Sequence, residues 1–149
     1  MSPQYLSEQT YKQTITNALD SAIDMLNQND KIMQQTLPEN KAMHYSNLND
    51  RTITMLNSVK TRFEEGMQMN PPDVAIVNRA LNEYIQKVEL SQSHFMYMAQ
   101  DMNDLAPFKQ KVEEIHITQM KFNHDVMQEQ ASKMSLISKQ NNSMSPPKP

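Results

Sequence analysis

Apolar residues recur at intervals of three and four along most of the chain, the spacing of one face of an α-helix. The clearest series covers about four and a half heptads and is apolar at every position except Ser91: Val74, Val77, Leu81, Tyr84, Val88, Ser91, Phe95, Met98, Met102 and Leu105. Such a sustained heptad seam is typical of helices that pack in the manner of a coiled coil.

Shorter seams lie on either side of this one. They comprise Tyr11, Ile15, Leu19, Ala22, Leu26, Asn29 and Met33, then Tyr45, Leu48, Thr52, Met55, Val59 and Phe63, and finally Phe108, Val112, Ile115, Gln119, Phe122 and Val126. Polar residues at seam positions, namely Asn29, Ser91 and Gln119, either fix the register of packing or mark places where water enters. Both interpretations stay open.

Prolines separate the four regions and indicate helix starts, because proline is tolerated in the first helical turn and disruptive further inside. Asn70 before Pro71 has the character of an N-cap, and Thr36 with Glu39 has the spacing of a capping box. We therefore predict four helices, over residues 9–35, 38–68, 72–105 and 108–139.

The predicted connections are only a few residues long, so consecutive helices should be antiparallel neighbours. The expected fold is all-α: an elongated antiparallel four-helix bundle with coiled-coil-like heptad packing, forming one domain over residues 1–139. Whether the seams close within one chain or between copies stays open. Residues 140–149 are polar and proline-rich, which predicts a flexible tail.

The last predicted helix carries a second apolar series, displaced around the helix from the seam through Phe122. We name it the methionine stripe, and it consists of Ile117, Met120, His124, Met127, Ala131 and Met134. Methionine is flexible and polarisable, and it suits both loosely packed cores and surfaces that adapt to a partner. A helix with two apolar faces has two neighbours or reserves one face for a partner. The stripe is our candidate partner-binding site.

Composition narrows the possible functions. The net charge is −3, the chain has no cysteine, and it has a single glycine. A slightly acidic chain is not built mainly to hold phosphate backbones, and one glycine cannot form the usual phosphate-binding loops or nucleophile elbows. The chain lacks the pattern of a secretory signal and any long apolar run. We expect a soluble protein in the cytoplasm or within a macromolecular assembly.

One short motif resembles a metal-binding pattern. Glu113 and His116 have the Glu-x-x-His spacing of di-iron bundles, but a second copy of the motif and two further glutamates would be needed. A metal-dependent bundle enzyme is therefore the least favoured of three hypotheses, and we expect no enzyme activity, cofactor or small-molecule substrate.

The favoured hypothesis is a helical scaffold, adaptor or chaperone subunit of a larger protein assembly, such as a secretion machine or virion. It would bind protein partners, and copies of itself, through the methionine stripe. Lys133, Lys139 and Lys148 near the C-terminus would form a secondary contact. The same lysines support the alternative of a nucleic-acid-associated accessory protein, although no arginine cluster or interleaved aromatic residues accompany them.

Overall fold

The computed structural model describes residues 6–143, with side chains as far as residue 141. Over this part of the chain all regular structure is helical, as predicted. The elements are α1 (Glu8–Thr36), α2 (Glu39–Glu64), α3 (Pro71–Phe95), the short 3₁₀ helix η1 (Met102–Leu105) and α4 (Ala106–Ser143). The predicted tail was expected to begin at residue 140, but α4 continues to Ser143. Residues 144–149 lie outside the described part.

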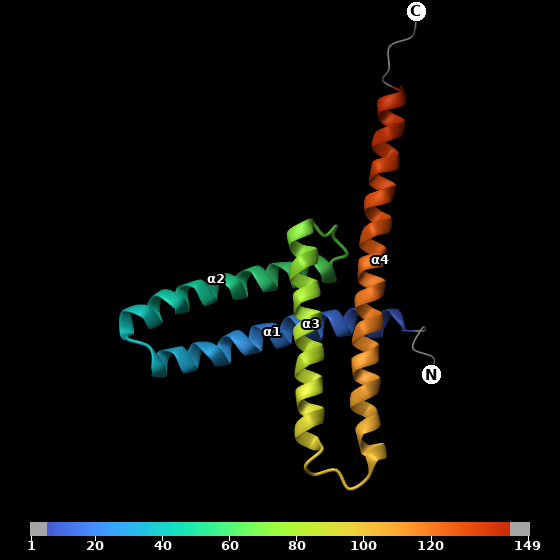
Figure 1. Cartoon of the computed structure of the whole chain (residues 1–149). Coiled ribbons are helices and arrows are strands. Elements are labelled where there is room, and N and C mark those ends of the chain that lie inside the picture. Colours follow the sequence, from blue (N-terminus) through green and yellow to red (C-terminus); the bar gives the residue numbers. More distant parts are fainter. Residues whose placement is uncertain (1–5, 144–149) are drawn as a thin grey trace, which may run out of the picture.

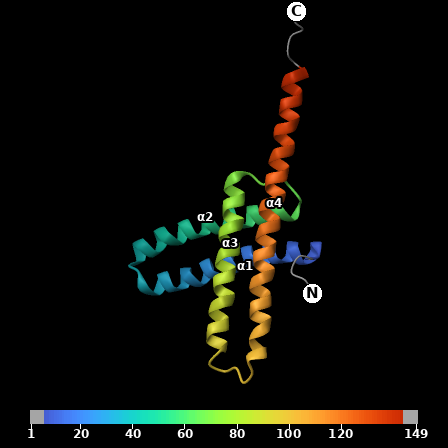
Figure 2. The same ribbon diagram turned by 45° about the vertical axis from the view of Figure 1, so that its right-hand side comes forward.

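The helices form two antiparallel hairpins that cross each other. Helices α1 and α2 make one hairpin, α3 and α4 make the other, and the two views in Figures 1 and 2 show the first hairpin running across the second. Helix α1 packs against all three other helices. The helices within each hairpin are antiparallel, as expected from the short connections, but α2 and α3 cross instead, and the four do not lie along one common axis. The elongated outline that we predicted is replaced by two crossed arms.

The core lies where the hairpins cross. Its completely or almost completely buried apolar residues come from all four helices and include Ile15, Leu19, Leu56, Val59, Val77, Leu81, Ile115 and Phe122. Aromatic edge-to-face contacts link Phe63 of α2 to Tyr11 of α1 and to Phe122 of α4, with ring centroids 6.1 and 6.4 Å apart. Burial of such side chains contributes about 1.5–3 kcal/mol each, so this crossing supplies most of the stability.

The buried face of α2 differs from the predicted seam. Tyr45, Leu48 and Met55 are exposed, whereas the heptad-spaced positions Ala42, Asn49 and Leu56 are buried. At Leu48 and Met55 the buried position is the next residue, about 100° around the helix. The predicted positions Val59 and Phe63, nearer the end of α2, do lie in or against the core. Ala42 and Asn49 carry little hydrophobic signal, so the larger apolar residues beside them dominated the pattern. Asn49 tolerates burial because its side-chain amide donates a 3.0 Å hydrogen bond to the Leu26 carbonyl.

Helix α3 starts as predicted and ends ten residues earlier. Its first turn carries Pro71 and Pro72, and the Asn70 side chain accepts a 2.9 Å hydrogen bond from the Asp73 backbone N–H. The helix stops at Phe95, and the expected seam positions Met98 and Met102 are exposed.

After α3 the chain turns and enters η1, whose start is capped by a hydrogen bond to the side chain of Asp101. The Asp101 carboxylate accepts this bond from the Asn103 N–H at 3.0 Å. Leu105 is buried again and positions the start of α4.

The boundary between α1 and α2 also differs from the prediction. Helix α1 includes Thr36, and the residue before α2 is Pro38, which makes no side-chain capping hydrogen bond. The predicted capping box of Thr36 and Glu39 is therefore wrong. Proline at this position fixes the backbone φ angle, so it can start the helix without a side-chain cap.

An ion pair fixes the connection between the two hairpins. Arg62 near the end of α2 donates two hydrogen bonds, of 3.0 and 2.7 Å, to the carboxylate of Asp73 in the first turn of α3. The Asp73 side chain is buried, and this hydrogen-bonded carboxylate raises the pKa of Arg62 above its ordinary value. Gly66, with a φ of 70°, lies between them and allows the chain to turn.

We predict that Arg62→Met destabilises the chain, because it leaves the Asp73 carboxylate buried without its cationic partner. The melting temperature, followed by circular dichroism, should fall by about 5–10 °C. Arg79→Met is the matched control, because Arg79 is itself exposed and pairs with Glu83 of the same helix, and it should change the melting temperature by less than about 2 °C. Equal effects of the two substitutions would contradict the role assigned to the Arg62–Asp73 pair.

Candidate interaction surfaces

Helix α4 has one face in the core and another that is open. Ile115, Thr118 and Phe122 are buried against the other helices. Met120 lies two residues from Phe122, about 200° further around the helix. Its side chain is 71% exposed. The two apolar series of this helix therefore have different environments within one chain.

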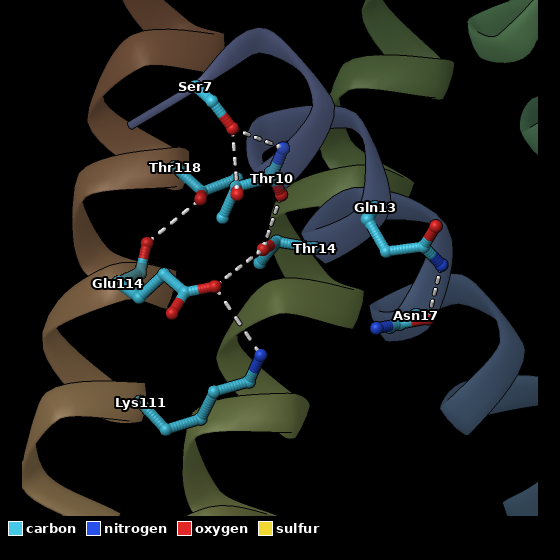
Figure 3. A network of polar contacts seen from close by, with 8 residues as sticks. All are labelled: Ser7, Thr10, Gln13, Thr14, Asn17, Lys111, Glu114 and Thr118. Atoms are coloured by element: carbon cyan, nitrogen blue, oxygen red, sulfur yellow. Dashed lines mark hydrogen bonds and ion pairs between the residues drawn. The ribbon is translucent and has the colours of Figure 1, made fainter. Parts of the chain in front are cut away.

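The first turns of α1 pack on α4 through a polar cluster, shown in Figure 3. The buried Thr14 hydroxyl lies 2.8 Å from the Thr10 carbonyl and 3.3 Å from the Glu114 carboxylate. Lys111 approaches the same carboxylate at 3.5 Å, and the Thr118 hydroxyl donates a 2.8 Å bond to the Glu114 carbonyl. Within this cluster the contact of Thr14 with Glu114 joins the two helices, and the other bonds hold the side chains of each helix in place.

A second contact continues along the same side. Tyr11 of α1 is buried, and the ammonium group of Lys121 lies 4.0 Å from the centre of its ring. Lys121 also pairs with Glu8 of α1 and Asp125 of α4, at 3.5 and 3.1 Å. Burial of the tyrosine, together with the charges of Asp125 and Glu8, raises the pKa of its phenol. The cation–π contact places positive charge between α1 and α4 where acidic side chains can neutralise it.

The contact between α3 and α4 contains a chain of neutral amides. Asn78 and Asn123 exchange hydrogen bonds of 2.9 and 3.0 Å, and Gln119 donates to Asn78 and to Asn82 at 3.1 and 3.0 Å. Gln119 was noted in the sequence as a polar residue at a seam position. Here it bonds directly to α3, and a one-turn slip would break these bonds, which favours the register interpretation.

The methionine stripe lies mainly on the open face. Met120, Met127 and Met134 are 71%, 68% and 71% exposed. His124 and Ala131 are also exposed, and Ile117 is partly buried. The three methionines therefore lie outside the core cluster of the single chain.

The C-terminal part of α4 projects beyond the crossed hairpins (Figure 1). Every side chain from residue 127 to residue 141 is exposed, including Lys133 and Lys139. Lys148, the third predicted tail contact, lies outside the described residues. Leu136 and Ile137 are also exposed, at 60% and 55%. This projecting segment therefore combines an apolar surface with few contacts of its own.

The sequence analysis missed grooves on the surface, two of which border the surfaces described above. The larger, about 540 Å³, lies between the first hairpin and α3 and is lined by residues that include Met25, Asn29, Ile32 and Met55. The available signal was the pair Met25 and Ile32, which lie beside the seam positions Ala22 and Asn29 of α1.

The second groove, about 510 Å³, lies between the α2–α3 connection and the projecting part of α4. Gln68, Asn70 and Pro71 line one side, and Val126, Met134 and Ile137 line the other. It could not be anticipated, because it depends on how the hairpins cross.

The remaining chemical candidates are at the surface. Glu113, His116 and His94 are exposed, and among the described residues no three acidic or histidine side chains are grouped so that they could hold a metal ion. No helix in the described range is long and apolar enough to cross a membrane.

Comparisons of the chain with known protein families, with curated proteins and with solved structures found no match. The surfaces themselves are therefore the basis for any functional proposal.

The two faces of α4 can be distinguished by alanine substitutions only two residues apart. Phe122→Ala should lower the free energy of unfolding by about 3–5 kcal/mol, because it leaves a cavity in the core. Met120→Ala should change it by no more than about 0.5 kcal/mol, because its side chain is already exposed. Urea denaturation measures both values. A large loss with Met120→Ala would show that the stripe packs within the chain.

Proposed function

We propose that this protein is a non-enzymatic helical adaptor, scaffold or chaperone subunit of a larger protein assembly. Its methionine stripe binds an apolar helical segment of a protein partner, and the projecting end of α4 is the principal contact. The observation that carries the proposal is the exposure of Met120, Met127 and Met134 in line on one face of one helix.

The physical argument begins with the exposed apolar surface. Isolated exposed apolar residues are ordinary, but aligned and contiguous ones on one helix face mark an interaction site. Three methionines at seven-residue intervals form such a line. A partner helix with apolar residues at i, i+3, i+4 and i+7 would cover it along its length. Methionine side chains adjust to the partner's shape, which suits an adaptor or a chaperone.

The projecting segment gives a second argument. A helix without tertiary contacts has little stability in water, because most helical stability in proteins comes from packing an apolar face. The side chains of residues 127–141 are all exposed. Three of them, Met127, Met134 and Ile137, are large and apolar, so their burial against another helix would be favourable. A partner helix laid along this segment would bury these apolar side chains.

We predict that Met127→Glu abolishes partner binding and leaves the fold intact. A charged side chain would have to be buried in the interface, whereas in the single chain it points into water. The far-ultraviolet circular dichroism and melting temperature should stay within error of the wild-type values. Co-purification of proteins from the cells in which the chain naturally occurs should be lost.

Ser132→Glu is the matched control, because it adds the same charge at an exposed polar residue about 140° around the helix from Met127. It should retain the co-purifying proteins. Loss of helicity in Met127→Glu would mean that the stripe is core. Unchanged co-purification would mean that the stripe is not the binding site.

A further inference from the structure

We infer that the methionine stripe pairs with the same stripe of a second copy, in antiparallel orientation, with the two-fold axis near residue 129. This inference rests on the proposed function and names the partner helix. It follows from the sizes of the stripe residues, the charges around them and the positions of the projecting ends.

The stripe is long enough for a helix pair. Its alternation of four and three residues continues one step further than the sequence pattern first indicated, to Ser138, which is exposed. From Ile117 to Ser138 it covers about three heptads, the shortest length at which a coiled-coil seam is usually convincing. Its first residues, Ile117, Met120 and His124, are all large. From Met127 onward large and small residues alternate, as Met127, Ala131, Met134 and Ser138.

That alternation favours the antiparallel arrangement. With the axis near residue 129, Met127 lies opposite Ala131 of the second copy, and Met120 lies opposite Ser138 of the second copy. Two of the three methionines of each copy then meet a small residue, which favours close packing, and Met134 meets His124 of the second copy. In a parallel pair, Met127 would meet Met127 and Ala131 would meet Ala131, so overcrowded and empty layers would alternate.

The surrounding charges do not oppose self-pairing. Between residues 127 and 141 the charged residues are Glu129, Lys133 and Lys139. Glu129 lies two residues from Met127, on the far side of the helix. Gln128 and Gln130, which border the stripe, are neutral. Further toward the core, Lys121 of one copy lies near Lys139 of the other, but Glu8 and Asp125 already neutralise Lys121.

Antiparallel pairing also provides contacts for the projecting segment. The segment of one copy would lie along residues 117–131 of the other copy's α4, part of which is held in place by α1 and α3. In a parallel pair, the projecting segment of one copy would contact the projecting segment of the other. The contact is isologous and closes as a dimer, because each copy contributes the same surface.

The test uses the full chain, which contains no cysteine, so introduced cysteines are the only thiols. Met120→Cys and Ser138→Cys should give little disulfide dimer when each is oxidised alone, because like positions lie about 27 Å apart along the antiparallel pair. Mixing the two variants should give a disulfide-linked heterodimer rapidly. Glu129→Cys, on the far side of the helix, should give none.

Size-exclusion chromatography with light scattering completes the test. Over a dilution series the wild-type chain should show twice the 17.3 kDa mass of one chain, and Met127→Glu should weaken dimerisation by about 100-fold. Rapid disulfide formation by Ser138→Cys alone would overturn the antiparallel arrangement. A wild-type chain that is monomeric throughout would overturn self-pairing. If such a monomer still loses its co-purifying proteins through Met127→Glu, the proposed function stands with a different partner.

Discussion

Ile15 and Leu19 of α1 are completely buried in one apolar cluster to which α2, α3 and α4 all contribute. This shared cluster is the constraint on which the arrangement depends, because it is where two helical hairpins are held across one another. A crossing buries side chains only near the point of contact. The outer part of the first hairpin and the end of α4 therefore remain exposed, and the surfaces available for binding follow from the way the core is formed.

Polar contacts determine which side of α4 remains open. Thr14 and Glu114 on one side, and the paired amides of Asn78 and Asn123 on the other, connect α4 to α1 and α3. These bonds are directional, so they fix the rotation of the helix more closely than apolar packing alone would. With that rotation fixed, the methionine stripe faces away from both neighbours. A core of the single chain that included the stripe would require breaking both groups of bonds.

The sequence predicted the helices well and their arrangement poorly. Proline positions and the Asn70 cap located the start of α3, and the apolar series identified the buried faces of α1 and α4. The end of α3 was missed because Met98 and Met102 kept the heptad spacing in a segment with no helix to pack against. Spacing records which residues share a face of a helix. It contains no information on where a second helix crosses that face, so the crossed arrangement and the groove between α1, α2 and α3 could not be derived.

The same limitation explains why the methionine stripe was identified but not assigned. Periodicity alone treats a core seam and an interface seam alike, because both bury apolar side chains against another helix. What separates them is whether the neighbouring helix belongs to the same chain. Phe122 finds its neighbours within the chain, whereas Met120, two residues earlier, does not. The stripe thus has the spacing of side chains that are normally buried, yet its methionines are exposed in the single chain. This difference is the strongest physical reason to propose that the stripe contacts another chain.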